Sequence, residues 1–102
     1  MTDADVIPLA LSKAAAARLI KEIGANPDNI VPVSHAKKRM IQRKISITQI
    51  RRVVQAGYID GDPWTDEHGY WRVTMRAKTA GDEITAGIAI EWRTKLLIIT
   101  VI

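Results

Sequence analysis

Hydrophobic and polar positions along the chain follow two different periods, one before and one after residue 70. Before it, apolar residues recur every three or four positions, which is the spacing of an amphipathic helix. After it, apolar and polar residues alternate, as they do in a half-buried β-strand. Helices followed by such strands predict an α+β fold, in which the N-terminal helices pack on one face of a C-terminal antiparallel meander.

The first predicted helix spans residues 8–24. Pro8 suits its first turn, where a missing N–H costs nothing, and Gly24 is a natural end. We expect residues 1–7 to form a flexible lead. The apolar stretch 30–33 is a candidate edge strand, because its proline cannot donate a hydrogen bond inside a sheet.

A basic two-helix segment is predicted over residues 34–57. Ser34 is placed as the N-cap of its first helix, and Ser46 or Thr48 as the N-cap of its second. Gly57 is expected to end the second helix.

The antiparallel sheet is predicted over residues 70–102, after a loop at 58–69 that shows no hydrophobic period. We expect a turn at 79–82 and a tight hairpin link at 93–94. The last strand, 95–102, is almost entirely apolar, so it should lie in the middle of the sheet or under a helix.

The charge pattern indicates an anionic partner. The chain has 102 residues, enough for a single domain, and a formal net charge of +4. Between residues 34 and 55 there is no acidic residue, but there are seven basic ones. They are Lys37, Lys38, Arg39, Arg43, Lys44, Arg51 and Arg52. Such a segment is typical of a nucleic-acid-binding surface, and RNA is the partner that we expect.

Three of the residues in this segment form a stripe. At 100° per residue, His35, Arg39 and Arg43 fall at about 0°, 40° and 80° around the helix. Ala36 and Met40 fall beside them, so the stripe borders the apolar, core-facing side. An imidazole with two guanidiniums can hold a phosphodiester and exchange a proton near neutral pH. The alternative is a basic amphipathic helix whose histidine is a cap or a surface residue.

The first strand of the meander carries a second group of candidates. Tyr70, Arg72 and Arg76 share one face, opposite Trp71 and its apolar neighbours. The arginines are candidate phosphate ligands, and Tyr70 or Trp71 is a candidate for stacking on an unpaired base. The alternative is ordinary decoration of a solvent-facing strand face. His68, in a polar loop, is a weaker acid–base candidate than His35.

Several kinds of site and location are not expected. The chain has no cysteine, only two histidines, and a tryptophan at residue 64 where a calcium loop needs an oxygen ligand, so we predict no metal site. No glycine-rich nucleotide loop or nucleophile elbow is present, and we expect no cofactor. The sequence contains no membrane-spanning apolar run and no leader signature, which predicts a cytoplasmic protein without a membrane partner.

The helix motif resembles that of a known family. The motif consists of Ser34, His35, Ala36, Arg39, Met40, Arg43 and Ile45. Together with the segment 47–57 and the closing strand Ile98–Ile102, it is similar to a bacterial family catalogued only as a domain of unknown function. The resemblance covers residues 33–102.

The order of helices and then a meander also resembles the RelE-like and barnase-like toxin folds. This resemblance implies a metal-independent ribonuclease, often paired with a cognate antitoxin. Only His35, Arg39, Arg43 and Arg72 carry over from the resemblance, as motif positions. Together with the strand pattern, it leads us to expect His35, Arg39 and Arg72 as catalytic residues. The expected substrate-binding residues are Arg43, Arg76, Tyr70 and Trp71.

Two other functions remain open at this point. The chain could be a non-catalytic module of the same fold that binds nucleic acid or protein. It could also be a partner-binding protein whose basic face meets an acidic protein surface, because charge alone does not separate these partners.

Overall fold

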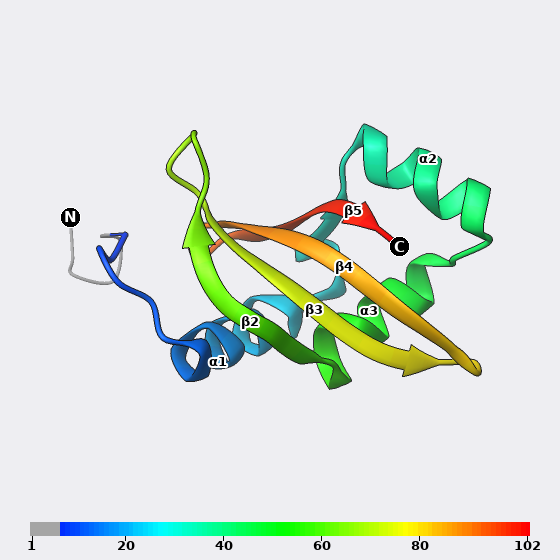
Figure 1. Ribbon diagram of the computed structural model, residues 1–102, viewed down its shortest axis with the longest axis horizontal. Coiled ribbons are helices and arrows are strands. Elements are labelled where there is room, and N and C mark those ends of the chain that lie inside the picture. Colours follow the sequence, from blue (N-terminus) through cyan, green and yellow to red (C-terminus); the bar gives the residue numbers. More distant parts are fainter. Residues whose placement is uncertain (1–6) are drawn as a thin grey trace.

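Five strands form one sheet in the computed structural model, which describes residues 7–102 (Figure 1). Of the predicted flexible lead, all but Ile7 lies outside the described residues. The strands are β1 (Ile30–Pro32), β2 (Tyr58–Thr65), β3 (Trp71–Thr79), β4 (Asp82–Glu91) and β5 (Lys95–Val101). Their order across the sheet is β1-β5-β4-β3-β2. β1 runs parallel to β5 and the other neighbours are antiparallel, so the sheet is mixed and the fold is α+β.

Helix α1 (Lys13–Gly24) begins later than the sequence predicted. The Ser12 hydroxyl accepts a hydrogen bond from the Ala15 N–H at 3.0 Å, and this cap starts the helix at Lys13 instead of Pro8. Gly24 ends α1 where the helix approaches its neighbour closely. A Cβ at Gly24 would lie 2.6 Å from a methyl carbon of Val54, so only glycine fits without a shift of that side chain.

The two basic helices are α2 (Ser34–Arg43) and α3 (Ile47–Ala56). Ser34 is not the N-cap of α2, because Val33 takes that place and no side chain caps the helix. The prediction for α3 is confirmed at both ends. Ser46 and Gln49 form a reciprocal capping box, and the helix closes at Gly57.

Strand β2 was missed by the sequence analysis, which predicted a loop at residues 58–69. β2 pairs with β3 on both sides of a register shift between Asp60 and Trp64. Gly61, with φ of 77°, lies within this irregular stretch, and Pro63 removes one donor. Because β2 is an edge strand with mostly exposed side chains, no hydrophobic alternation marks it in the sequence.

The hydrophobic core lies between the sheet and helices α1 and α3. Side chains of β3, β4 and β5 that share one face are buried against these helices, together with Ile20, Ile50 and Val53. The predicted central position of the last strand is confirmed, since β5 lies between β1 and β4. We call this covered side the inner face of the sheet.

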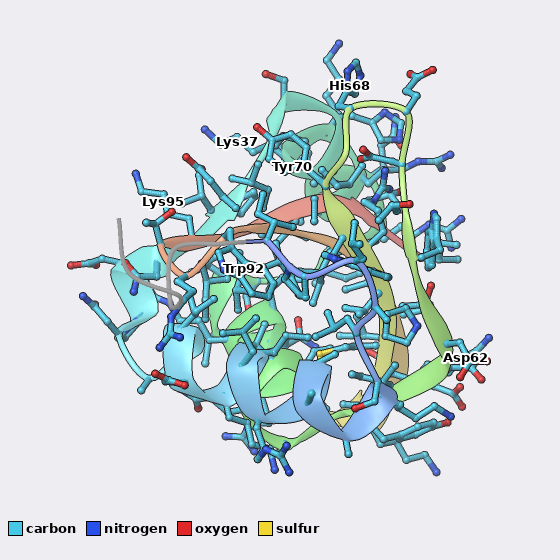
Figure 2. All side chains as sticks on the ribbon, turned by 90° about the vertical axis from the view of Figure 1, so that its left-hand side faces the viewer. Lys37, Asp62, His68, Tyr70, Trp92 and Lys95 are labelled. Carbon is cyan, nitrogen blue, oxygen red and sulfur yellow. The ribbon has the colours of Figure 1, made fainter. Side chains whose placement is uncertain are left out.

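Helix α2 lies on the other side of the sheet, which corrects the expectation that all helices pack on one face. α2 packs against β5 and β1, whereas α1 and α3 pack against each other and against the inner face. Figure 2 shows α1 and α3 below the sheet, with α2 and the β2–β3 loop above it. Ala36 is the residue of α2 that is fully buried in this packing. We call the side of the sheet that carries α2 the outer face.

No helix in the described part of the chain has the length and apolar character that crossing a bilayer requires.

Candidate functional site

The two flanks of α2 differ in composition and in what they face. Taking the buried Ala36 as the direction of the sheet, Lys37 and Ile41 lie on one side of it by the helical period. His35, Arg39 and Arg43 lie on the other side, which we call the histidine flank. Lys44, the C-cap that follows the helix, lines the same groove as Lys37 and Ile41.

The position of Pro32 tells which way each flank points. Lys37 and Ile41 line a groove together with Pro32, which belongs to the edge strand β1. The histidine flank therefore points away from that edge, toward the side where β4 and β3 follow β5. The predicted stripe is confirmed as one flank of a helix, and it borders the outer face of the sheet.

The histidine flank is accessible, and no carboxylate among the described residues pairs with it. His35 and Arg43 are exposed, and Arg39 is partly buried. Among residues 7–102, none of the ion pairs involves His35, Arg39 or Arg43. An arginine without a carboxylate partner keeps its donors for an external anion.

The two arginines of β3, Arg72 and Arg76, share one face of the sheet but have different partners. Both lie on the outer face, since their neighbours Trp71, Val73 and Met75 are buried on the inner one. Arg76 donates from Nε to Asp60 at 2.8 Å and from Nη1 to Glu83 at 3.3 Å. These hydrogen bonds, the one to Asp60 above all, raise the pKa of Arg76, and the two carboxylates balance its charge.

Arg72 is held differently, in a small cluster at the β2–β3 loop. Its Nη1 lies 3.5 Å from the Asp66 carboxylate, and its guanidinium lies over the Trp64 ring, 5.7 Å from the centroid. Its Nε is buried and has no hydrogen-bond partner. Asp66 and Trp64 therefore hold the Arg72 guanidinium on the outer face, beside the edge strand β2.

Asp66 organises the loop that carries this cluster. One of its carboxylate oxygens accepts hydrogen bonds from the backbone N–H of His68 at 2.9 Å and of Tyr70 at 3.0 Å. Burial acts to raise the pKa of Asp66, but the two backbone bonds and Arg72 outweigh it, so the pKa is lowered. The charged carboxylate of Asp66 therefore holds the loop in its conformation.

The aromatic candidates divide between surface and core. Tyr70 is 38% exposed and lies above the sheet, on the side of α2 (Figure 2). Trp71 is not available for stacking on a base, because it is only 7% exposed and belongs to the core. Its indole N–H donates to the Pro8 carbonyl at 3.0 Å, which ties the N-terminal segment to β3.

Trp64 is the accessible tryptophan of this region, and the sequence analysis missed it as a binding residue. It is 44% exposed and pairs with Arg72 across the β2–β3 ladder. Because one side of its ring faces the Arg72 guanidinium, the ring is fixed in place while part of it stays open. The sequence signal for this residue was a large aromatic side chain between the charged residues of a stretch that was predicted to be a loop.

His68 lies at the tip of the same loop and is largely exposed, 3.5 Å from Glu67. This position is that of a solvent-facing histidine. Among residues 7–102, no three His, Asp or Glu side chains gather closely enough to hold a metal ion.

The site residues thus border one surface from two sides. The histidine flank of α2 lies on one side of the outer face, and Arg72 with Trp64 and Tyr70 lies on the other. In the described residues, His35 and Arg72 share no hydrogen bond or ion pair, and the outer-facing side chains of β4 lie between their elements. The predicted meeting of His35, Arg39 and Arg72 in one cleft stays a prediction.

A comparison with protein families gives the class of the chain. The fold is an α+β domain whose second helix presents a basic flank beside an open sheet face. Residues 33–102, more than half of the chain, match the family described as Domain of unknown function (DUF4258), and the chain belongs to this family. The match contains every residue of the site and begins just before α2, so α1 and β1 precede it. No curated protein and no solved structure matches the chain.

Proposed function

We propose that this protein is a toxin-type, metal-independent endoribonuclease that binds single-stranded RNA across the outer face of its sheet. The observation that carries the proposal is the histidine flank of α2. It combines one imidazole with two guanidiniums that have no carboxylate partner among the described residues, and it borders the surface where Arg72 is anchored.

Arg39, Arg43 and Arg72 are the proposed phosphate ligands. Guanidiniums bind phosphate oxygens in a bidentate manner and stay charged at any accessible pH. Arg76 is left out of this set because two carboxylates hold it, Asp60 at 2.8 Å and Glu83 at 3.3 Å, whereas Arg72 has a single carboxylate neighbour, Asp66, at 3.5 Å. Trp64 takes the stacking role first considered for Trp71, and Tyr70 keeps its own, because aromatic rings bind the faces of unpaired bases.

The proposed reaction needs only groups of the chain, the RNA and water. The RNA 2′-oxygen attacks the adjacent phosphorus and gives up its proton, and the bond from phosphorus to the 5′-oxygen breaks. The products are a 2′,3′-cyclic phosphate and a 5′-hydroxyl. His35 acts as the general base for the 2′-hydroxyl or as the general acid for the leaving 5′-oxygen, and water takes part in the other proton transfer. The arginines stabilise the charge on the phosphorane.

The toxin assignment rests on resemblance rather than on the site. The order of helices and then a meander is similar to the RelE-like toxin fold, whose members cleave RNA and are often paired with an antitoxin. Because fold alone does not fix function, this part of the proposal needs its own test. Expression of the chain should arrest bacterial growth, and co-expression of a cognate antitoxin should restore it.

Cleavage of a labelled single-stranded RNA by the purified protein tests the enzymatic proposal. His35→Ala should lower the rate by about 10²–10⁴-fold, the usual contribution of a general acid or base. His68→Ala is the matched control, since it removes the other, solvated histidine, and it should cleave at the wild-type rate. Both histidines are exposed, so both variants should melt at the wild-type temperature.

Two results would reject the proposed mechanism. Cleavage that EDTA abolishes, or that His35→Ala leaves unchanged, would contradict the mechanism. RNA binding without cleavage by the wild-type protein would instead favour the alternative function, a non-catalytic binding module of the same fold.

A further inference from the structure

The flank of α2 opposite to the histidine flank lines an apolar groove. The groove has a volume of about 690 Å³ and lies between α2, the turn to α3 and the edge strand β1. Pro32, Met40, Ile41, Ile45 and Ile47 supply its apolar lining. This volume falls in the range of about 300–1,000 Å³ that is common for ligand-binding sites.

Ile41 is the residue that the fold explains least. It is 80% exposed on the surface of a regular helix, although its neighbour Met40 packs against the core. A large apolar side chain exposed beside other apolar surface is typical of an interaction site. The packing of the domain does not require an isoleucine there.

The rim of the groove is positively charged. Lys37 lies one turn before Ile41 on α2, and Lys44, the C-cap of the helix, follows Ile41 by three residues. Neither lysine forms an ion pair among the described residues, and the segment 34–55 contains no acidic residue. The groove is therefore complementary to an apolar surface flanked by carboxylates. A second copy of this flank would bring lysines against lysines.

We propose that this groove, the Ile41 groove, binds an acidic amphipathic helix of a partner protein. Lys37 and Ile41 are one helical turn apart on α2, and Lys44, the C-cap of α2, extends this lining of the groove past the end of the helix. A partner helix lying along this lining places apolar side chains into the groove and carboxylates next to the lysines. RNA and this partner then bind opposite flanks of one helix.

The identity of the partner as an antitoxin rests on the proposed function, whereas the occupation of the groove by an acidic helix does not. The test therefore uses a defined probe and leaves RNA cleavage as a separate readout. The probe is a fluorescein-labelled peptide of about four helical turns, with leucines at i, i+4 and i+7 and glutamates around them. A second peptide has lysine in place of every glutamate.

Binding is measured by fluorescence anisotropy with the full chain and three variants. The wild-type protein should bind the acidic peptide saturably and not the basic one. Ile41→Asp should weaken binding by about 30-fold, as expected for loss of an apolar anchor. Gln42→Asp is the matched control, because it places the same charge on the neighbouring exposed position outside the groove, and it should bind clearly more tightly than Ile41→Asp. The double variant Lys37→Glu/Lys44→Glu should reverse the preference between the two peptides.

Three outcomes would overturn the proposal. They are the absence of saturable binding of the acidic peptide to the wild-type chain, equal binding by Ile41→Asp and wild type, and a wild-type dimer that Ile41→Asp converts to a monomer. The last would show that a second copy fills the groove. Ile41→Asp should cleave RNA at the wild-type rate, so a failure of the ribonuclease proposal and a failure of the groove proposal are seen in different assays.

Discussion

The salt dependence of RNA binding tests the proposed phosphate ligands one by one. Each phosphate contact to a single strand contributes about −0.7 to the slope of log K against log salt concentration. Three contacts, from Arg39, Arg43 and Arg72, give a slope of about −2.1. The affinity should then fall by about 18-fold between 50 and 200 mM salt, since 4 to the power 2.1 is about 18. Arg39→Ala should have a slope of about −1.4 and lose about 7-fold over the same range.

Lys37→Ala is the matched control for this experiment. It removes one positive charge from the same helix, but from the flank that lines the Ile41 groove. Its slope should stay at the wild-type value, as should that of Arg76→Gln, because Asp60 and Glu83 already balance Arg76. The assay is anisotropy of a labelled 2′-O-methyl oligonucleotide, which blocks the 2′-oxygen and prevents cleavage. Equal slopes for wild type and Arg39→Ala, or a shallower slope for Lys37→Ala alone, would refute the assignment of the histidine flank.

Three further predictions concern the loop, the fold and the stacking site. Because the pKa of Asp66 is lowered in the folded protein, its charged form stabilises the fold above the unfolded-state pKa. This stability is lost as the pH falls through the folded-state pKa. The free energy of unfolding, measured with urea, should therefore fall less steeply below about pH 4 in Asp66→Asn than in the wild type. Gly57→Ala should lower the free energy of unfolding by about 1–3 kcal/mol, because its Cβ would overlap the Val53 carbonyl and lie 2.7 Å from the Arg76 carbonyl oxygen. An unchanged urea midpoint would contradict this. Trp64→Ala should cost about 1–3 kcal/mol of RNA affinity whereas Trp64→Phe keeps most of it, and equal affinities would remove Trp64 from the site.

Helix ends could be predicted where the candidate capping residues lay within two positions of each other. Ser46 or Thr48 was expected to begin α3 and Gly57 to end it, and in the structure Ser46 is the N-cap and Gly57 the C-cap. For α1, the sequence offers two start signals, Pro8 and Ser12, and Ser12 caps the helix in the structure. The Pro8 carbonyl instead accepts a hydrogen bond from the Trp71 indole N–H.

The candidate site was predictable in its chemistry and less so in its placement. The helical period found the histidine flank, because the period depends on α2 alone. It could not show that α2 covers the outer face, since an apolar stripe as short as Ala36 and Met40 fits either side of a sheet. β2 and Trp64 were missed for a related reason. An exposed edge strand is held by its backbone pairing with β3, which leaves no hydrophobic pattern.

An NMR titration with a short 2′-O-methyl RNA tests most directly whether RNA binds between α2 and the β2–β3 loop. The account predicts chemical-shift changes at His35, Arg39 and Arg43, at the outer face of β3 around Arg72, and in the loop at Tyr70. It predicts none along the Ile41 groove or on α1 and α3. Changes confined to the groove or to the inner helices, or no changes at low salt, would contradict the proposed RNA-binding surface.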